Sequence, residues 1–151
     1  MENNEVVDIL NDLIETSKDG EYGFTACAER ATSAELRQIF SRRAADCASG
    51  AQELQALVVQ YGGKAEDSGT VAGAMHRGWV SVRDAVSGNS DQAILDECER
   101  GEDVALGRYR KTMKQADLPV TVLQAVERQM AGVQANHDQI KTLRDTLRAN
   151  S

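Results

Sequence analysis

Apolar residues recur at steps of three and four over four long stretches of the chain, which is the spacing that places them on one face of an α-helix. The first stretch, from about Glu5 to Ala31, has the stripe Val6, Leu10, Leu13, Ser17, Gly20, Phe24, Cys27 and Ala31. The second stretch, to about Tyr61, has the stripe Leu36, Phe40, Arg43, Cys47, Gly50, Leu54, Leu57 and Tyr61. Both stretches predict amphipathic helices.

Two further stretches show the same period in the second half of the chain. The third, from Ser90 or Asp91 to about Ala116, has the stripe Leu95, Cys98, Glu102, Ala105, Tyr109 and Met113. The fourth, from Pro119 to about Arg148, has the stripe Leu123, Val126, Met130, Val133, His137, Ile140 and Leu147. Each of the four predicted helices is roughly 40 Å long at 1.5 Å per residue. Equal lengths favour a bundle.

The breaks between these stretches indicate how the helices connect. Thr32-Ser33-Ala34-Glu35 resembles a capping box, so the second helix follows the first after a tight turn and lies antiparallel to it. A longer segment separates the second and third helices; it begins at Gly62-Gly63 and includes a predicted short helix at about Val71–Ser87, with Trp79 as its anchor on the bundle. The pattern of tight, long and tight connections predicts an all-α, ferritin-like four-helix bundle with one long crossover. We expect one domain over 1–151.

Composition and charge exclude several classes of protein. Aromatic residues make up only 4% of the chain, which disfavours a sheet. The net charge of −7 disfavours binding to nucleic acid and to anionic membranes, and no apolar run approaches the roughly 20 residues of a membrane span. The polar N-terminus is unlike a secretory signal. The three cysteines lack CxxC spacing, so we expect buried, reduced thiols in a cytoplasmic protein.

Polar residues interrupt the stripes at positions that the topology brings to one level. Glu21 flanks the first stripe, and Arg43, Glu102 and His137 lie on the other three. If the crossover spans the bundle, the first three lie 11 residues from the same end, which corresponds to about 16 Å. The last two helices then place Glu102 opposite Gln134 and Glu99 opposite His137, with Asp46 near the same level. We therefore expect an internal polar layer.

This layer has two interpretations, because buried charges must pair with each other or hold an ion. One is a network of salt bridges. The other is a site for a single iron, manganese or zinc ion, since carboxylates and imidazole suit these metals. Its candidate ligands are Glu21, Glu99, Glu102 and His137. A di-iron bundle site takes Glu-x-x-His from two helices, whereas here one helix offers Gln134-x-x-His137 and another offers Arg43 and Asp46. Such a site would be degenerate, and Arg43 would oppose the metal.

Several local runs resemble a known family over nearly the whole chain. They are Asp19–Phe24, Gly62-Gly63, Trp79, Glu99–Asp103, Tyr109 and His137-Asp138. With these runs the chain is similar to ferritin-like bacterial four-helix-bundle proteins that are grouped as a domain of unknown function. The resemblance implies a ferritin-like fold and implies no reaction.

The functional hypothesis from the sequence leans away from an enzyme, because no complete catalytic motif is present. It favours a bundle that acts through assembly, as a homo-oligomer, or through partner binding, with neither nucleic acid nor membrane among the partners. Arg43 supports this hypothesis, because a buried cation suits a salt-bridge network better than a metal site. The alternative is a metal-binding bundle with a redox or stress-related role.

Overall fold

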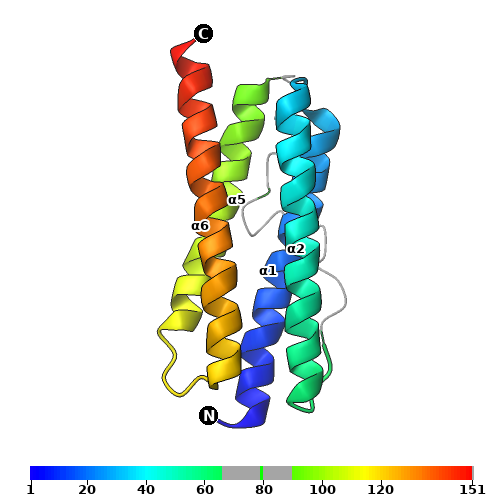
Figure 1. The fold of residues 1–151 in the computed structure, drawn as a ribbon, viewed down its shortest axis with the longest axis vertical. Coiled ribbons are helices and arrows are strands. Elements are labelled where there is room, and N and C mark those ends of the chain that lie inside the picture. The colour runs from blue at the N-terminus through cyan, green and yellow to red at the C-terminus, as the bar shows by residue number, and fades with distance from the viewer. Residues whose placement is uncertain (66–78, 80–89, 151) are drawn as a thin grey trace.

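The computed structural model describes residues 1–65, 79 and 90–150 of the 151-residue chain. This part of the chain forms four helices and no strand: α1 (Asn3–Arg30), α2 (Ala34–Gln60), α5 (Asp91–Met113) and α6 (Val120–Ala149). The helices lie side by side along a common axis (Figure 1). The prediction of an all-α helical bundle is confirmed. The short helix predicted at residues 71–87 lies outside the described residues, except for Trp79.

The start of α5 lies against the turn between α1 and α2. The carboxylate of Asp91 accepts hydrogen bonds from the Thr32 backbone N–H at 2.8 Å, the Thr32 hydroxyl at 2.8 Å and the Ser33 N–H at 3.1 Å. The end of α2 lies at the opposite end of the bundle (Figure 1). The helices α2 and α5 therefore run in the same direction, as the sequence predicted for one long connection between them.

Ser33 caps the N-terminus of α2, and the predicted capping role of Thr32 is wrong. The Ser33 hydroxyl accepts a hydrogen bond from the Leu36 N–H at 3.3 Å and so pairs one of the amides that the first turn leaves unbonded. Thr32 instead donates its N–H and its hydroxyl proton to Asp91. The helix therefore begins one residue later than predicted, at Ala34.

The predicted glycine stop of α2 is confirmed. Gly62 has φ +79°, a left-handed conformation in which a side chain is strained. The Gly62 N–H donates to the Val59 carbonyl and the Gly63 N–H to the Val58 carbonyl, both at 3.0 Å. These two bonds pair carbonyls that the last turn would otherwise leave unbonded, the arrangement of a Schellman motif.

The hydrophobic core is divided into two clusters along the bundle. The cluster near the α1–α2 turn contains Phe24, Cys27, Leu36, Phe40, Leu95, Cys98 and Ile140, and the cluster at the other end contains Val6, Leu10, Leu13, Leu54, Tyr109, Val126 and Val133. These residues belong to the predicted stripes. Leu147 is the exception, because its side chain is 36% exposed and the last turns of α6 extend beyond the other helices (Figure 1).

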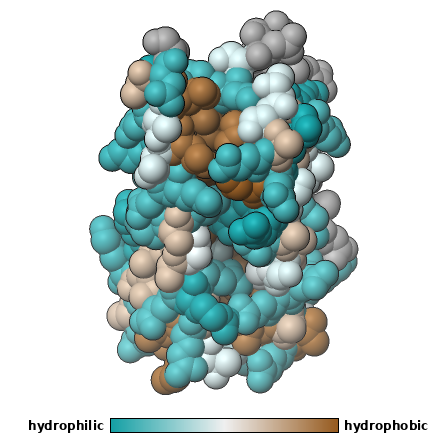
Figure 2. All heavy atoms as spheres, turned by 45° about the horizontal axis from the view of Figure 1, so that its top comes forward, coloured by the Kyte–Doolittle hydropathy of each residue, from teal (hydrophilic) through white to brown (hydrophobic). Residues whose placement is uncertain are grey.

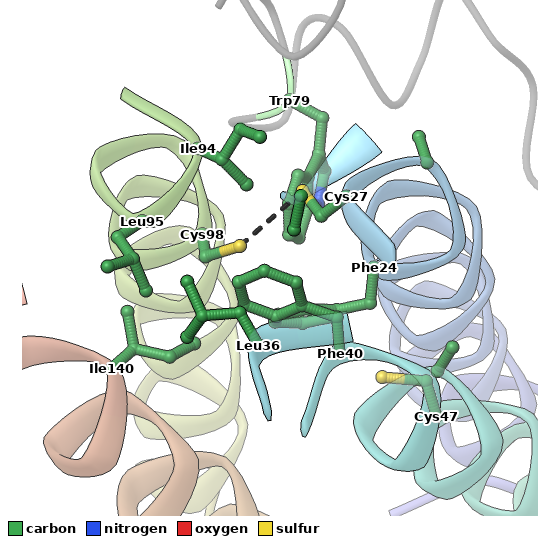
Figure 3. Packing of buried hydrophobic residues seen from close by; sticks show 13 residues of the cluster. Phe24, Cys27, Leu36, Phe40, Cys47, Trp79, Ile94, Leu95, Cys98 and Ile140 are labelled. Carbon is green, nitrogen blue, oxygen red and sulfur yellow. Dashed lines mark hydrogen bonds between the residues drawn. The ribbon is translucent and has the colours of Figure 1, made fainter. Parts of the chain in front are cut away.

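Trp79 fills a gap between α1 and α5. A Cβ atom at Gly23 would lie 2.2 Å from the indole, and one at Gly101 would lie 2.5 Å from it. The indole also packs edge-on against Phe24, with 4.9 Å between the ring centres, and is only 4% exposed. Figure 3 shows it among the buried residues of the cluster near the α1–α2 turn. The predicted anchoring role of Trp79 is confirmed.

The three cysteines are free and buried, as predicted. Burial raises the pKa of the Cys47 thiol to about 12 and holds that of Cys98 well above its ordinary value. The Cys98 thiol lies 3.5 Å from the sulfur of Cys27, so these two residues link α5 to α1 (Figure 3). None of the helices in the described ranges is long and apolar enough to cross a membrane.

Candidate functional site

A buried ion pair lies between the two core clusters and joins α2 to α5. The Arg43 Nε atom lies 3.1 Å from Glu102 Oε2, and the two side chains are 11% and 3% exposed. Asn136 on α6 donates a second hydrogen bond to the same oxygen, at 2.7 Å from its Nδ2 atom. Burial raises the pKa of Glu102, although Arg43 and Asn136 favour its charged form and oppose that shift.

Arg43 keeps its charge in this environment. Burial by itself would lower its pKa, but the negative charges that Cys47 and Glu102 carry when ionised outweigh burial and raise it. The centre of the guanidinium also lies 5.9 Å from the centre of the Phe24 ring, a distance at which the ring face attracts a cation. The arrangement is therefore an internal ion pair with an aromatic neighbour.

A second polar group lies nearer the surface, where α5 faces α6. It consists of Glu99 and Asp103, which are four residues apart and so share one face of α5, and His137 of α6. One ligand atom from each of the three lies within 4.8 Å of the other two. The His137 Nε2 atom is 2.7 Å from Asp103 Oδ1, and its Nδ1 atom is 3.3 Å from Asp138 Oδ1.

Two buried atoms of this group lack a good hydrogen-bond partner. Glu99 Oε2 and His137 Nε2 are buried and make no hydrogen bond of normal geometry. Each lies within ion-pair distance of a neighbour, since Glu99 pairs with Arg144 and His137 with Asp103. Both atoms lie close to a charged neighbour without the direction that a hydrogen bond needs, so they are electrostatically paired but poorly hydrogen-bonded.

The structure divides the predicted polar layer into these two groups. Within the described residues, Glu21 forms no ion pair with either group. Its Oε1 atom lies 3.7 Å from Lys18 Nζ on the same helix, and its side chain is 38% exposed. Gln134 accepts from Arg110 at 3.3 Å and donates to Asp138 at 2.9 Å. The place expected for Gln134 beside Glu102 is taken by Asn136.

Sequence reasoning did not find Asn136, Asp103 or Arg144 as members of these groups. Asp103 had a usable signal, because it follows Glu99 by four residues on the same helix. Arg144 had a signal as well, because it lies four residues after Ile140 and three before Leu147 and so interrupts the apolar stripe of the last helix. Asn136 lies off that stripe, and nothing in the pattern separates it from surface residues.

A cavity of about 410 Å³ adjoins the buried ion pair. All four helices line it, and so does Trp79. On its wall the Tyr109 hydroxyl donates to Gln129 Oε1 at 2.8 Å, and Gln129 Nε2 donates to Glu53 Oε1 at 2.7 Å. Glu53 also pairs with Arg128, so polar groups link α2, α5 and α6 around the cavity. Asp46, expected in the polar layer, is an exposed residue of its lining.

The model of a family described as a domain of unknown function (DUF2383) matches residues 5–115. The chain belongs to the DUF2383 family. The match spans α1, α2 and α5, and it ends before α6, which supplies Asn136 and His137. A search of curated proteins finds no match. Membership in DUF2383 confirms that part of the resemblance which named a domain of unknown function.

The two polar groups of this DUF2383 domain differ in what they can do chemically. The Glu102 carboxylate already has a cation and an amide donor on one oxygen, so it serves the internal ion pair. The Glu99, Asp103 and His137 group presents two carboxylates and an imidazole at ligand spacing. A divalent cation accepts this donor set.

Proposed function

We propose that this DUF2383 protein is a ferritin-like four-helix bundle that binds one first-row divalent metal ion and is not itself an enzyme. The ligands are Glu99, Asp103 and His137, and the metal is iron, manganese or zinc. The observation that carries the proposal is the approach of three potential ligand atoms to within 4.8 Å of one another. The poorly hydrogen-bonded Glu99 Oε2 and His137 Nε2 atoms support it, because a bound cation would satisfy both.

The donor set fits a single ion better than two. Imidazole and carboxylate suit the first-row divalent metals, and three protein ligands leave a coordination position for water. Glu21 and Glu102, which the sequence offered as further ligands, belong to other contacts. In this proposal the metal takes the place of Arg144 as the partner of Glu99.

A calorimetric titration of metal-free protein with Zn²⁺, Mn²⁺ and, without oxygen, Fe²⁺ tests the site. We expect one ion per chain for at least one of these metals, and at least a tenfold weaker affinity in His137→Gln and Asp103→Asn. Arg144→Met removes the competing cation and should bind metal more tightly. Glu21→Gln is the matched control and should bind as wild type does. Equal affinity in wild type and His137→Gln, or no binding in either, would reject the proposal.

The ferritin-like assignment rests on the direction of the helices, because α5 starts beside the α1–α2 turn. A redox or stress-related role follows if the bound metal is iron, because iron changes its oxidation state. A cytoplasmic location belongs to the same proposal, and it is supported by the three free cysteines.

Assembly into a homo-oligomer is a second candidate, and one surface feature favours it. Figure 2 shows a hydrophobic area near the end of the bundle that carries the α1–α2 turn. Ile39 of α2 and Leu143 of α6 belong to that end and are only partly buried. Light scattering of wild type and Leu143→Glu tests this candidate. We expect an oligomer in wild type that the charge dissociates, and a wild-type monomer would reject it.

A further inference from the structure

We propose that the cavity between the four helices binds a small zwitterionic molecule of the α-amino-acid type. This site is separate from the proposed metal site, because Glu99, Asp103 and His137 are not among the residues that line the cavity. Its binding groups are Arg43 and Glu102, with Tyr109 and Gln129 farther along the wall.

The size of the cavity suits a small molecule. Its volume of about 410 Å³ is near the lower end of the roughly 300–1,000 Å³ found for ligand pockets. A polar space of this size holds on the order of a dozen waters when no ligand is bound. A ligand that enters must therefore replace the hydrogen bonds of those waters, which a polar molecule does and a hydrocarbon does not.

The cavity opens between α2 and α6. The lining residues of α1 are buried, whereas Asp46 and Ser49 of α2 and Arg128 and Gly132 of α6 are exposed. Of the neighbouring helix pairs in the bundle, α2 and α6 make the least extensive contact. A small molecule can therefore reach the buried wall from this side, on which α2 and α6 lie in front in Figure 1.

The ion pair at the inner wall retains capacity for both ends of a zwitterion. Arg43 uses Nε for Glu102, and its two terminal nitrogens have no acceptor among the described residues. Glu102 accepts both of its hydrogen bonds on Oε2, and Oε1 has no donor in the same part of the chain. A ligand carboxylate fits the planar fork of Arg43, and an adjacent ammonium fits Glu102.

The charges around the cavity favour a ligand that carries both signs. The described lining has three guanidinium groups and four carboxylates: Arg43, Arg108, Arg128, Asp19, Asp46, Glu53 and Glu102. A net anion would meet the carboxylates, and a net cation would meet the arginines, so each loses part of what it gains. A zwitterion has a partner for each charge. The Tyr109 hydroxyl oxygen and Gln129 Oε1 can accept further hydrogen bonds from its side chain, whereas their own protons are already donated.

Calorimetry and thermal melts with the twenty protein amino acids, added one at a time in the presence of a chelator, test the ligand class. Acetate and ethylamine serve as probes that carry only one of the two charges. We expect at least one amino acid to bind and to raise the melting temperature. Acetate and ethylamine should bind at least tenfold more weakly. If no amino acid binds, the proposal is overturned. If acetate or ethylamine binds as tightly as the amino acid, the claim that the site needs both charges is overturned.

Two glycines provide matched variants that test the location. Gly132 lines the cavity and Gly107 does not, and a Cβ atom at either position meets no atom within 4 Å. Gly132→Leu should therefore fold and fill the mouth, with at least a tenfold loss of affinity, whereas Gly107→Leu should bind as wild type does. Arg43→Lys keeps the charge but lacks the planar fork, and should also lose at least tenfold. Unchanged affinity in Gly132→Leu would place the ligand elsewhere. Because a chelator is present, this result is independent of the metal titration.

Discussion

Asp91 and Thr32 are 59 positions apart in the sequence, yet the Asp91 carboxylate accepts hydrogen bonds from both the N–H and the hydroxyl of Thr32. This contact fixes the start of α5 against the α1–α2 turn, on the side where the long connection arrives. It holds the turn and the helix start together through a charged acceptor.

Asp91→Ala should lower the free energy of unfolding by about 1.5–3 kcal/mol, the range for hydrogen bonds to a charged group. Urea melts followed by circular dichroism give the value. Asp12→Ala is a control in an exposed part of α1 and should stay within about 0.5 kcal/mol of wild type. A loss in Asp91→Ala no larger than that of the control would contradict the role of this contact.

Removing Arg43 should be costly, because it leaves the Glu102 carboxylate buried without its cation. We expect Arg43→Met to lose on the order of 3–5 kcal/mol of unfolding free energy, as for a buried pair that loses one partner. The exposed neighbour Arg42→Met is the control and should change little. The double variant Arg43→Met, Glu102→Gln should recover part of the loss. Strict additivity in this cycle would show that the pair does not interact.

The raised pKa of Glu102 gives a pH dependence with a definite sign. Its folded pKa lies above the ordinary value of 4.5, because burial disfavours the charged form. The folded state thus binds the proton more tightly than the unfolded state, and the contribution of this group to stability falls as the pH rises from 4.5 through the folded pKa. The unfolding free energy of wild type minus that of Glu102→Gln should therefore become smaller as the pH rises over that window. An increase over it would contradict the assignment.

The glycines beside Trp79 should not tolerate a side chain. A Cβ at Gly101 would lie 2.5 Å from the indole, so Gly101→Ala should lose about 1–3 kcal/mol through overpacking. Gly107→Ala on the same helix meets no neighbour and should gain up to about 1 kcal/mol from helix propensity. Fluorescence of Trp79, the only tryptophan, should change in Gly101→Ala and not in Gly107→Ala. Equal stability of the two variants would refute this packing.

The three thiols should react slowly with a thiol reagent in the native protein and rapidly in denaturant. Burial blocks access, and the raised pKa values of Cys47 and Cys98 keep the reactive thiolate scarce near neutral pH. Mass spectrometry after timed labelling gives the rate at each cysteine. Fast native labelling of Cys47 would show that its position on the buried face of α2 is wrong.

The sequence predicts most of this fold because the apolar stripes, the glycine stop at Gly62 and the single proline mark the helices directly. It also predicts that Arg43 and Glu102 lie at one level, since both interrupt stripes at equal distances from one end. It does not predict which partner each side chain selects. Glu102 bonds to Asn136 and not to Gln134, because counting residues from the helix ends gives the level along α6 but not the direction, and these two residues lie about 200° apart around the helix.

One turn of α5 places its side chains against three different neighbours. In the run Glu99–Asp103, Gly101 faces the indole of Trp79, Glu102 meets Arg43, and Glu99 and Asp103 lie beside His137. Successive residues on a helix are about 100° apart, so all of these contacts depend on the same rotation of α5 about its axis. A point substitution removes one contact and leaves the others in place. The insertion of a single residue just before Glu99 would instead rotate the whole run and misdirect all three contacts at once.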